Sequence, residues 1–197
     1  MGYMEILKKR RSVYGLSGDM KTGSEEIVSM VYRIIEETPS AFNMQSSRAV
    51  ILFGDEHRRL WAITTDILKE VASPIDFPAT KKKMEMFAKA AGTIMFFENE
   101  KTVDDIKAQY AKFADSFDMF AAHSLGMLQI NVWNAFAEKN IGANLQHYNP
   151  LIDDAVKKQW DIPDGWRLVS EMVFGTAVSE PEPVNKMPGE ERVRVYK

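Results

Sequence analysis

The 197-residue sequence contains no cysteine and only three histidines, His57, His123 and His147. Without a thiol there is no disulfide framework, no cysteine-ligated zinc or iron–sulfur cluster and no thiol nucleophile. The histidines include no H-E-x-x-H pair, which argues against a histidine metal site, and we expect no bound metal. We expect His123, which lies in an apolar helical stretch, to be a core histidine with satisfied hydrogen bonds.

Further absences narrow the classes of function. The sequence has no G-x-S-x-G, P-loop or G-x-G-x-x-G motif. No apolar run reaches the roughly 18–20 residues of a membrane span, and the N-terminus places its apolar residues before its basic ones, the reverse of a secretory signal. The net charge of −3 gives no general attraction to nucleic acid. We expect a cytoplasmic protein without membrane or nucleic-acid partners.

The residues that are present favour one folded domain spanning 1–197. Hydrophobic residues make up 45% of the chain, enough for a sizeable core. Helix dominates but strands are interspersed, which predicts an α+β or three-layer α/β domain. The expected helices are 3–9, 24–37, 56–72, one after Pro78, 101–140 with a break near Phe117, and 151–160. The expected strands are 49–53, 93–97, 167–175 and, after an extended arm beginning at residue 179, an edge strand over 191–196.

Two features of this pattern suggest an extensive interface. Residues 120–137 are apolar on nearly every face of the expected helix, as in a helix at a domain centre or a subunit contact. The strand expected over 191–196 follows an irregular linker and must pair with some sheet edge. That edge could belong to the same chain or to a partner.

Three polar segments could carry chemistry. Arg10-Arg11-Ser12 offers planar, permanently charged donors and a hydroxyl that suit a phosphate, although a solvated basic turn is an equally simple interpretation. The loop 39–47 gathers hydroxyls and amides that both donate and accept, or it is a helix cap with a polar turn. Residues 142–150 allow close backbone approach at Gly142, or they form a helix cap and connection. The lysines at 81–83 are expected on a solvated helix face.

Taken together, these segments resemble the nitroreductase family of flavoproteins over nearly the whole chain. The resemblance is carried by Arg-Arg-Ser near the start, Pro-Ser-x-x-Asn-x-Gln at 39–45, Gly-Ala-x-Leu-Gln-His at 142–147 and an extended C-terminal arm. The sequence is most similar to a subgroup of small nitroreductases that includes the yeast fatty-acid-repression-mutant protein. The resemblance implies a three-layer fold with a mainly antiparallel sheet, and a homodimer whose C-terminal arms exchange.

The resemblance also implies one FMN per subunit at the dimer interface. The FMN phosphate would lie against Arg10 and Ser12, with Arg11 nearby and Tyr14 where many relatives carry a base. The loop 39–45 would come from the other subunit, and the backbone at 145–147 would run beside the ring. A C-terminal base, Arg194 or Lys186, would complete the phosphate site. The full implied set is Arg10, Arg11, Ser12, Tyr14, Pro39, Ser40, Ala41, Asn43, Gln45, Leu145, Gln146, His147, Lys186 and Arg194.

The implied activity is reduction of nitroaromatic or quinone-type small molecules by NADH or NADPH in a ping-pong reaction. Because the flavin carries the hydride chemistry, we expect no essential side-chain acid or base. Phe42, Phe113, Phe117 and Tyr148 are candidates for stacking walls, or they are ordinary core residues. An alternative is a flavin-binding regulatory or stress-response protein with incidental reductase activity.

Overall fold

A computed structural model describes residues 2–197. Its helices are α1 (Tyr3–Lys9), α2 (Ser24–Glu37), α3 (Gly54–Val71), α4 (Phe77–Ala88), α5 (Glu100–Gln109), α6 (Phe117–Glu138) and α7 (Asp153–Trp160). Its strands are β1 (Leu16–Ser17), β2 (Ser47–Phe53), β3 (Gly92–Asn99), β4 (Gly142–Gln146) and β5 (Trp166–Ala177). Short 3-10 turns, η1 (Ala41–Asn43), η2 (Ala111–Ser116) and η3 (Gly189–Glu191), complete the elements. Within this range no helix combines the length and apolar character needed to cross a bilayer.

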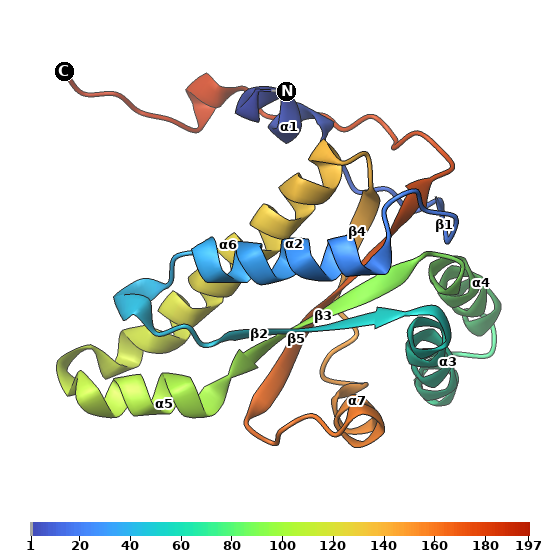
Figure 1. The fold of residues 1–197 in the computed structure, drawn as a ribbon, viewed down its shortest axis with the longest axis horizontal. Coiled ribbons are helices and arrows are strands. Elements are labelled where there is room, and N and C mark those ends of the chain that lie inside the picture. Colours follow the sequence, from blue (N-terminus) through green and yellow to red (C-terminus); the bar gives the residue numbers. More distant parts are fainter. Residues whose placement is uncertain (1) are drawn as a thin grey trace.

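The sheet is organised around β5, its longest strand. The strand order is β1-β5-β3-β2, with β4 also paired to β5, and every pair of strands is antiparallel. Helices α2 and α6 cover one face, while α3, α4 and α7 pack on the other (Figure 1). Each face has its own core, one around Trp61 and Phe87 and the other around Phe96 and Phe136. The expected three-layer, mainly antiparallel fold is therefore confirmed.

Helix α6 follows the expected break in the chain at Phe117, where η2 separates it from α5. The face of α6 toward the sheet is buried, but its opposite face is exposed, with Met119 half exposed and Met127 and Ile130 more than a third exposed. His123 also lies exposed on this helix, so the prediction of a core histidine there was wrong. The apolar residues around His123 point away from the sheet of their own chain.

Two parts of the chain differ from the sequence prediction. The segment 142–146 forms strand β4 rather than a helix cap and connection. The tail over 191–196 forms no strand; it is exposed and irregular after η3, because no sheet edge of the described chain pairs with it. Conversely, the outer edge of β2 has no neighbour in the described sheet.

The core histidine of the fold is His57 on α3. Its Nε2 lies 3.1 Å from the carbonyl oxygen of Phe87, and because a carbonyl only accepts, Nε2 carries the proton. Its Nδ1 lies 2.9 Å from Thr93 Oγ1 and accepts the hydroxyl proton, while the same Thr93 oxygen accepts from Trp61 Nε1 at 3.1 Å. The neutral ring thus joins α3, α4 and β3, and burial lowers the pKa of His57 to about 4.

This arrangement predicts acid sensitivity. In the unfolded chain His57 titrates near its usual pKa of about 6.5. The folded state resists protonation, so stability present above pH 6.5 is lost as the pH falls toward 4, by about 3 kcal/mol in total. Denaturant titrations of the wild type and of His57→Gln between pH 7.5 and 4 should give free energies of unfolding that converge as the pH falls. In the apoprotein, His147→Gln, at an exposed position just beyond β4, is the matched control and should follow the wild type. Parallel curves for wild type and His57→Gln would contradict the assignment.

Candidate functional site

Two of the three polar segments, 130 residues apart in sequence, lie side by side. After α1 the chain runs along β4, with a parallel bridge between Ser12 and Ala143. Val13 N donates to Ala143 O at 2.9 Å, and the Asn144 side-chain amide donates to Val13 O at 2.8 Å. The basic segment at 10–12 is therefore fixed in register against the strand that leads to residues 145–147.

Buried side chains of β4 stabilise the contact between residues 10–13 and this strand, which we call the junction. Asn144 and Gln146 are both buried, and Gln146 Nε2 donates to Asn144 Oδ1 at 2.8 Å. Leu145 points to the opposite face and packs against the α2–α6 core, while His147 is exposed just beyond the strand. With its side-chain amide hydrogen-bonded to Asn144, Gln146 would meet a ligand at this point largely through backbone.

Two guanidinium groups stand at the start of this junction without carboxylate partners. Arg10 lies over the Trp133 ring of α6, 4.6 Å from its centroid, and Arg11 donates to the carbonyl oxygen of Glu182 in the arm. No ion pair of residues 2–197 involves either arginine. Burial, with the neighbouring charge of Arg11, lowers the pKa of Arg10, as expected for a cation that lacks a counter-ion. Ser12 and Tyr14 are exposed beside them.

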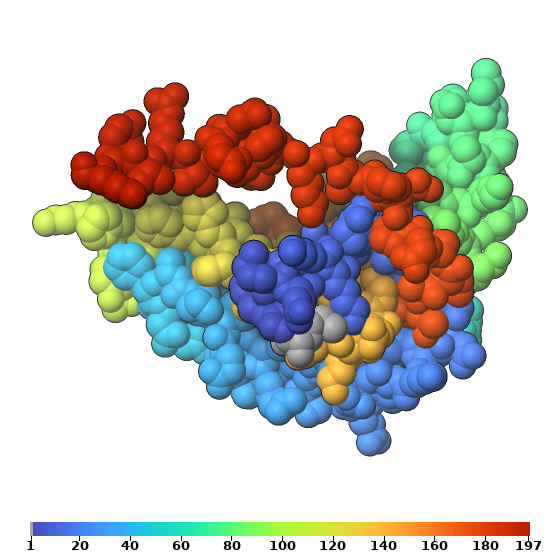
Figure 2. Space-filling model, turned by 90° about the horizontal axis from the view of Figure 1, so that it is seen from above, coloured from blue at the N-terminus to red at the C-terminus, as the bar shows by residue number. Residues whose placement is uncertain are grey.

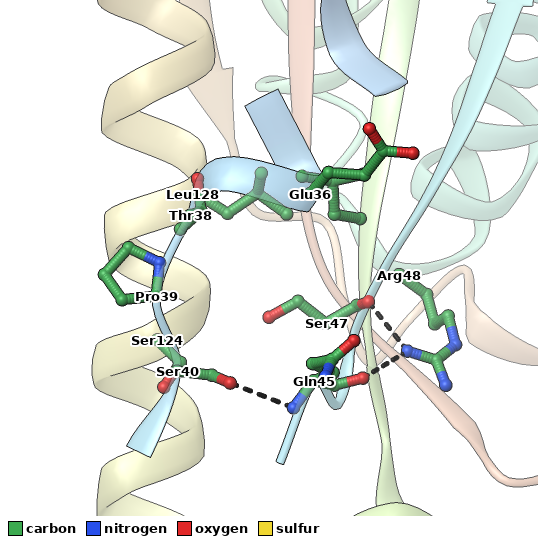
Figure 3. Close-up of a pocket in the computed structure, with 10 residues that line it drawn as sticks. Glu36, Thr38, Pro39, Ser40, Gln45, Ser47, Arg48, Ser124 and Leu128 are labelled. Atoms are coloured by element: carbon green, nitrogen blue, oxygen red, sulfur yellow. Dashed lines mark hydrogen bonds between the residues drawn. The ribbon is translucent and has the colours of Figure 1, made fainter. Parts of the chain in front are cut away.

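The third segment is a strained loop around η1. Phe42, Asn43 and Gln45 all have positive φ angles, of 54°, 52° and 50°. This conformation is unusual for a bulky residue such as Phe42 and must be held by its surroundings. Gln45 N donates to Ser40 Oγ at 2.9 Å, and Arg48 Nη1 donates to Gln45 O at 2.6 Å (Figure 3).

A cavity of about 240 Å³ opens beside this loop, between the end of α2 and α6. Pro39, Ser40 and Gln45 line it, together with Ser124 and Leu128 of α6. Ala41, the remaining residue of the implied loop set, is anchored to α6 by its backbone N–H, which donates to Ser124 Oγ at 3.3 Å.

The loop 39–45 and the arginine segment are not brought together within one chain. The loop is anchored to α6 at Ser124, whereas Arg10 contacts the same helix at Trp133. Nine residues of helix separate these points, about 14 Å along the axis. Figure 1 shows η1 and α1 at opposite ends of α6. Within one chain the two segments therefore lie apart.

The C-terminal arm, residues 179–197, also stands apart. Val178 N donates to Gly15 O at 2.9 Å, and beyond the contact of Glu182 with Arg11 the arm runs along the outside of the molecule (Figure 2). Lys186 and Arg194 are exposed and form no hydrogen bond or ion pair within residues 2–197.

An exposed aromatic group lies next to the strained loop. The Phe42 ring is 4.8 Å from Tyr110, 5.2 Å from Phe117 and 6.1 Å from Phe113 between centroids. Phe42 and Phe113 are about half exposed, so their rings offer a flat apolar surface. Tyr148, the other expected stacking residue, lies elsewhere, 5.7 Å from the ring of Trp61.

The sequence did not predict that Lys83 and Glu171 lie near the 145–148 segment. Lys83 is exposed, as expected of the lysine run, but its Nζ lies 5.9 Å from the centroid of the Tyr148 ring. Glu171 on β5 is completely buried opposite Gln146, and burial raises the pKa of its carboxyl to about 8. The sequence offered one indication that Glu171 is unusual, because it is the only acidic residue within the apolar run 168–175. Nothing in the sequence indicated that Lys83 lies near Tyr148, because that contact depends on how α4 packs in the folded chain.

Comparison with known proteins places this geometry in a family. The sequence profile of the nitroreductase family matches residues 7–176. Two proteins of Saccharomyces cerevisiae are similar over 91% of this chain and 90% of their own lengths: HBN1 at 36% identity and the nitroreductase FRM2 at 34%.

Solved structures agree with this assignment. Nitroreductase CinD from Lactococcus lactis, in complex with nicotinic acid, superposes with a TM-score of 0.93 at 36% identity, covering 100% of both chains. CinD also has structures with chloramphenicol and with 4-nitrophenol. A nitroreductase from Desulfitobacterium hafniense with bound FMN shares the fold, with a TM-score of 0.72 at 16% identity over 100% of both chains. The chain described here therefore belongs to the nitroreductase family.

Proposed function

We propose that this nitroreductase binds FMN and uses NADH or NADPH to reduce nitroaromatic or quinone-type acceptors in a ping-pong reaction. The observation that carries the proposal is the junction of residues 10–13 with β4. It places two guanidinium groups that form no ion pair within residues 2–197, and the exposed hydroxyl of Ser12, next to the strand that leads to residues 145–147. This combination suits a ligand with an anionic end and a flat end.

The arginine segment fits the phosphate of FMN. Arg10 and Arg11 are permanently charged, and Ser12 can add a short hydrogen bond to a phosphate oxygen. A phosphate would supply the counter-ion that the lowered pKa of Arg10 indicates is missing. Arg194 or Lys186 of an exchanged arm would add a further positive charge, since both are exposed and form no hydrogen bond or ion pair within residues 2–197.

The backbone at 145–147 fits the wall of the ring site. The hydrogen bond between Gln146 and Asn144, and that between Asn144 and Val13, fix this strand end relative to the arginines. FMN would supply the hydride chemistry, and the chain would bind it, orient it and exclude water. We assign no catalytic acid or base to the chain.

The aromatic surface of Phe42, Tyr110 and Phe113 fits a flat, electron-poor acceptor. Stacked aromatic rings gain energy beyond that of simple burial. The complexes of CinD with nicotinic acid and 4-nitrophenol involve ring-shaped molecules of this kind. The acceptor would be sandwiched between this surface and the flavin.

The functional unit we propose is a homodimer. An exposed apolar surface such as the outer face of α6 is stabilised when another apolar surface buries it. The same face of a second α6 would provide such a surface. Such a dimer could bring the loop 39–45 of one chain to the arginine segment of the other, which one chain alone does not do. The free edge of β2 and the unpaired arm would satisfy each other's backbone groups between chains.

FMN retention tests the phosphate site. Arg10→Ala should weaken FMN binding by about 1–3 kcal/mol, because it removes a charge-assisted hydrogen bond to the phosphate. Isothermal titration of the apoprotein with FMN and with riboflavin measures this loss. FMN affinity should fall, whereas the affinity for riboflavin, which lacks the phosphate, should not. Arg58→Ala, an exposed arginine on α3, is the control. Unchanged FMN affinity would remove Arg10 from the site.

Turnover tests the enzymatic role. Stopped-flow mixing of the FMN-loaded protein with NADH or NADPH should bleach the flavin absorbance, and 4-nitrophenol or a quinone should restore it in a separate step. Steady-state initial rates should give parallel double-reciprocal lines, as a ping-pong reaction requires. Rapid bleaching without turnover by any acceptor would instead favour the regulatory role.

Removing the arm tests the dimer. Deletion of residues 185–197 should weaken self-association, because the arm could no longer pair with a partner's sheet edge. Sedimentation velocity over a dilution series should show monomer at concentrations where the full chain remains dimeric. The exposed substitution Lys101→Ala on α5 is the control and should leave self-association unchanged. An unaltered dimer would contradict arm exchange.

A further inference from the structure

Glu171 has a setting that the proposed function leaves unexplained. It lies in β5 between Gln146 of β4 and Met95 of β3, and none of its surface is exposed. Its Oε2 accepts the backbone N–H of Tyr148 at 3.1 Å, whereas its Oε1 has no partner among the described residues. A buried carboxylate with so little compensation is costly, which favours the protonated form.

Two further buried polar atoms of the segment after Tyr148 lack partners among the described residues: Asn149 Oδ1 in the turn and Asp153 Oδ1 at the start of α7. The nearest titratable neighbours are Asp153, whose charge further raises the pKa of Glu171, and the phenol of Tyr148, whose pKa burial raises above its usual value. No lysine or arginine pairs with Glu171 within residues 2–197.

Basic groups lie near these neighbours rather than on Glu171 itself. Lys157 and Arg167 lower the pKa of Asp153, which burial raises, and Lys83 of α4 lies across the ring of Tyr148. The elements that pack on Glu171 thus contribute one carboxyl, one phenol and no contacting cation. A proton is the simplest counter-charge available to this carboxyl.

The carboxyl is linked directly to the segment proposed to hold the flavin ring. Its hydrogen-bond donor is the backbone of Tyr148, and its cross-strand partner is Gln146, so it adjoins the residues on both sides of His147. Negative charge added to a ligand beside 145–147 would therefore be felt at Glu171 through a dry, low-dielectric interior. Such a charge makes ionisation of Glu171 harder.

We propose that, at pH values where Glu171 is ionised before reduction, it takes up a proton when the flavin held beside residues 145–147 is reduced, and that it thereby couples the cofactor's midpoint potential to pH. The inference rests on the proposed function. A hydride from the nicotinamide would carry two electrons and one proton to a bound flavin. Where Glu171 is ionised, a water molecule would give up a second proton to one of its carboxylate oxygens, forming the O–H bond there and leaving hydroxide in the solvent. No further oxidant or reductant takes part.

The direction of the effect follows from the ionisation of Glu171. At pH values where Glu171 is already protonated before reduction, it takes up no proton. The midpoint potential then changes with pH only through the one proton that accompanies the two electrons. Above a pH of about 8, where burial has placed its pKa, Glu171 is ionised before reduction and protonated afterwards. Two protons then accompany two electrons instead of one, so the slope of potential against pH should double.

Spectroelectrochemical titration of the FMN-bound dimer between pH 7 and 9.5 measures this slope without turnover. The wild type should show a twofold steepening near pH 8, and Glu171→Gln should show one unchanged slope. Glu98→Gln is the matched control, because Glu98 is also a buried carboxyl with a pKa raised by burial but lies opposite Arg167 near the C-terminal end of β3, whereas Glu171 lies opposite Met95. This control should keep the steepening.

A single slope in the FMN-bound wild type overturns the inference about Glu171 but not the proposed function, whatever the variants do. A steepening that persists in Glu171→Gln does the same. If Glu171→Gln does not fold, proton uptake by the wild type on photoreduction, followed with a pH-indicator dye, replaces it: one extra proton per flavin at pH 9 supports the inference, and none overturns it. A protein that takes up no FMN overturns the proposed function and this inference with it.

Discussion

The pairing of residues 12–13 with β4 is the contact on which the rest of the site depends. It consists of one backbone hydrogen bond and one from a buried amide, Val13 N to Ala143 O and Asn144 Nδ2 to Val13 O. Because β4 is itself paired to the central strand β5, the arginine segment is tied to the most constrained part of the sheet. The distance between the anion-binding end and the ring-binding end of the proposed site is therefore set by sheet geometry rather than by a flexible loop.

Several groups lack a partner within residues 2–197. Arg10 and Arg11 form no ion pair there, the outer face of α6 is apolar and exposed, the outer edge of β2 is free, and no strand pairs with the arm. A second copy would cover the helix and pair the arm, while a phosphate would neutralise the arginines. The positive φ angle of Phe42 belongs to the backbone conformation that turns the loop 39–45 toward the exterior, where a partner's site would lie.

The sequence predicted the regular parts of the fold well. Helix α2 has the predicted bounds because its apolar period, its N-terminal polar residues and Pro39 agree. Strand β4 was missed because Asn144 and Gln146 face inward; their hydrogen bonds to Val13 and to each other come from contacts that local pattern does not reveal. The tail strand was expected from alternation alone, but alternation does not supply the neighbouring edge that a strand needs. The positions of Lys83 and Glu171 beside Tyr148 likewise depend on which elements pack together.

The claim that each FMN site is shared between two chains is tested most directly by mixed dimers. One chain carries Arg10→Ala and the other Asn43→Ala, each with a different affinity tag, and the heterodimer is purified through both tags. If the arginine segment of one chain meets the loop of the other, one site of the heterodimer combines both wild-type segments and the other combines both substitutions. Equilibrium FMN titration should then find one site of wild-type affinity per heterodimer and none in either homodimeric variant. A heterodimer with no site of wild-type affinity would contradict the shared site.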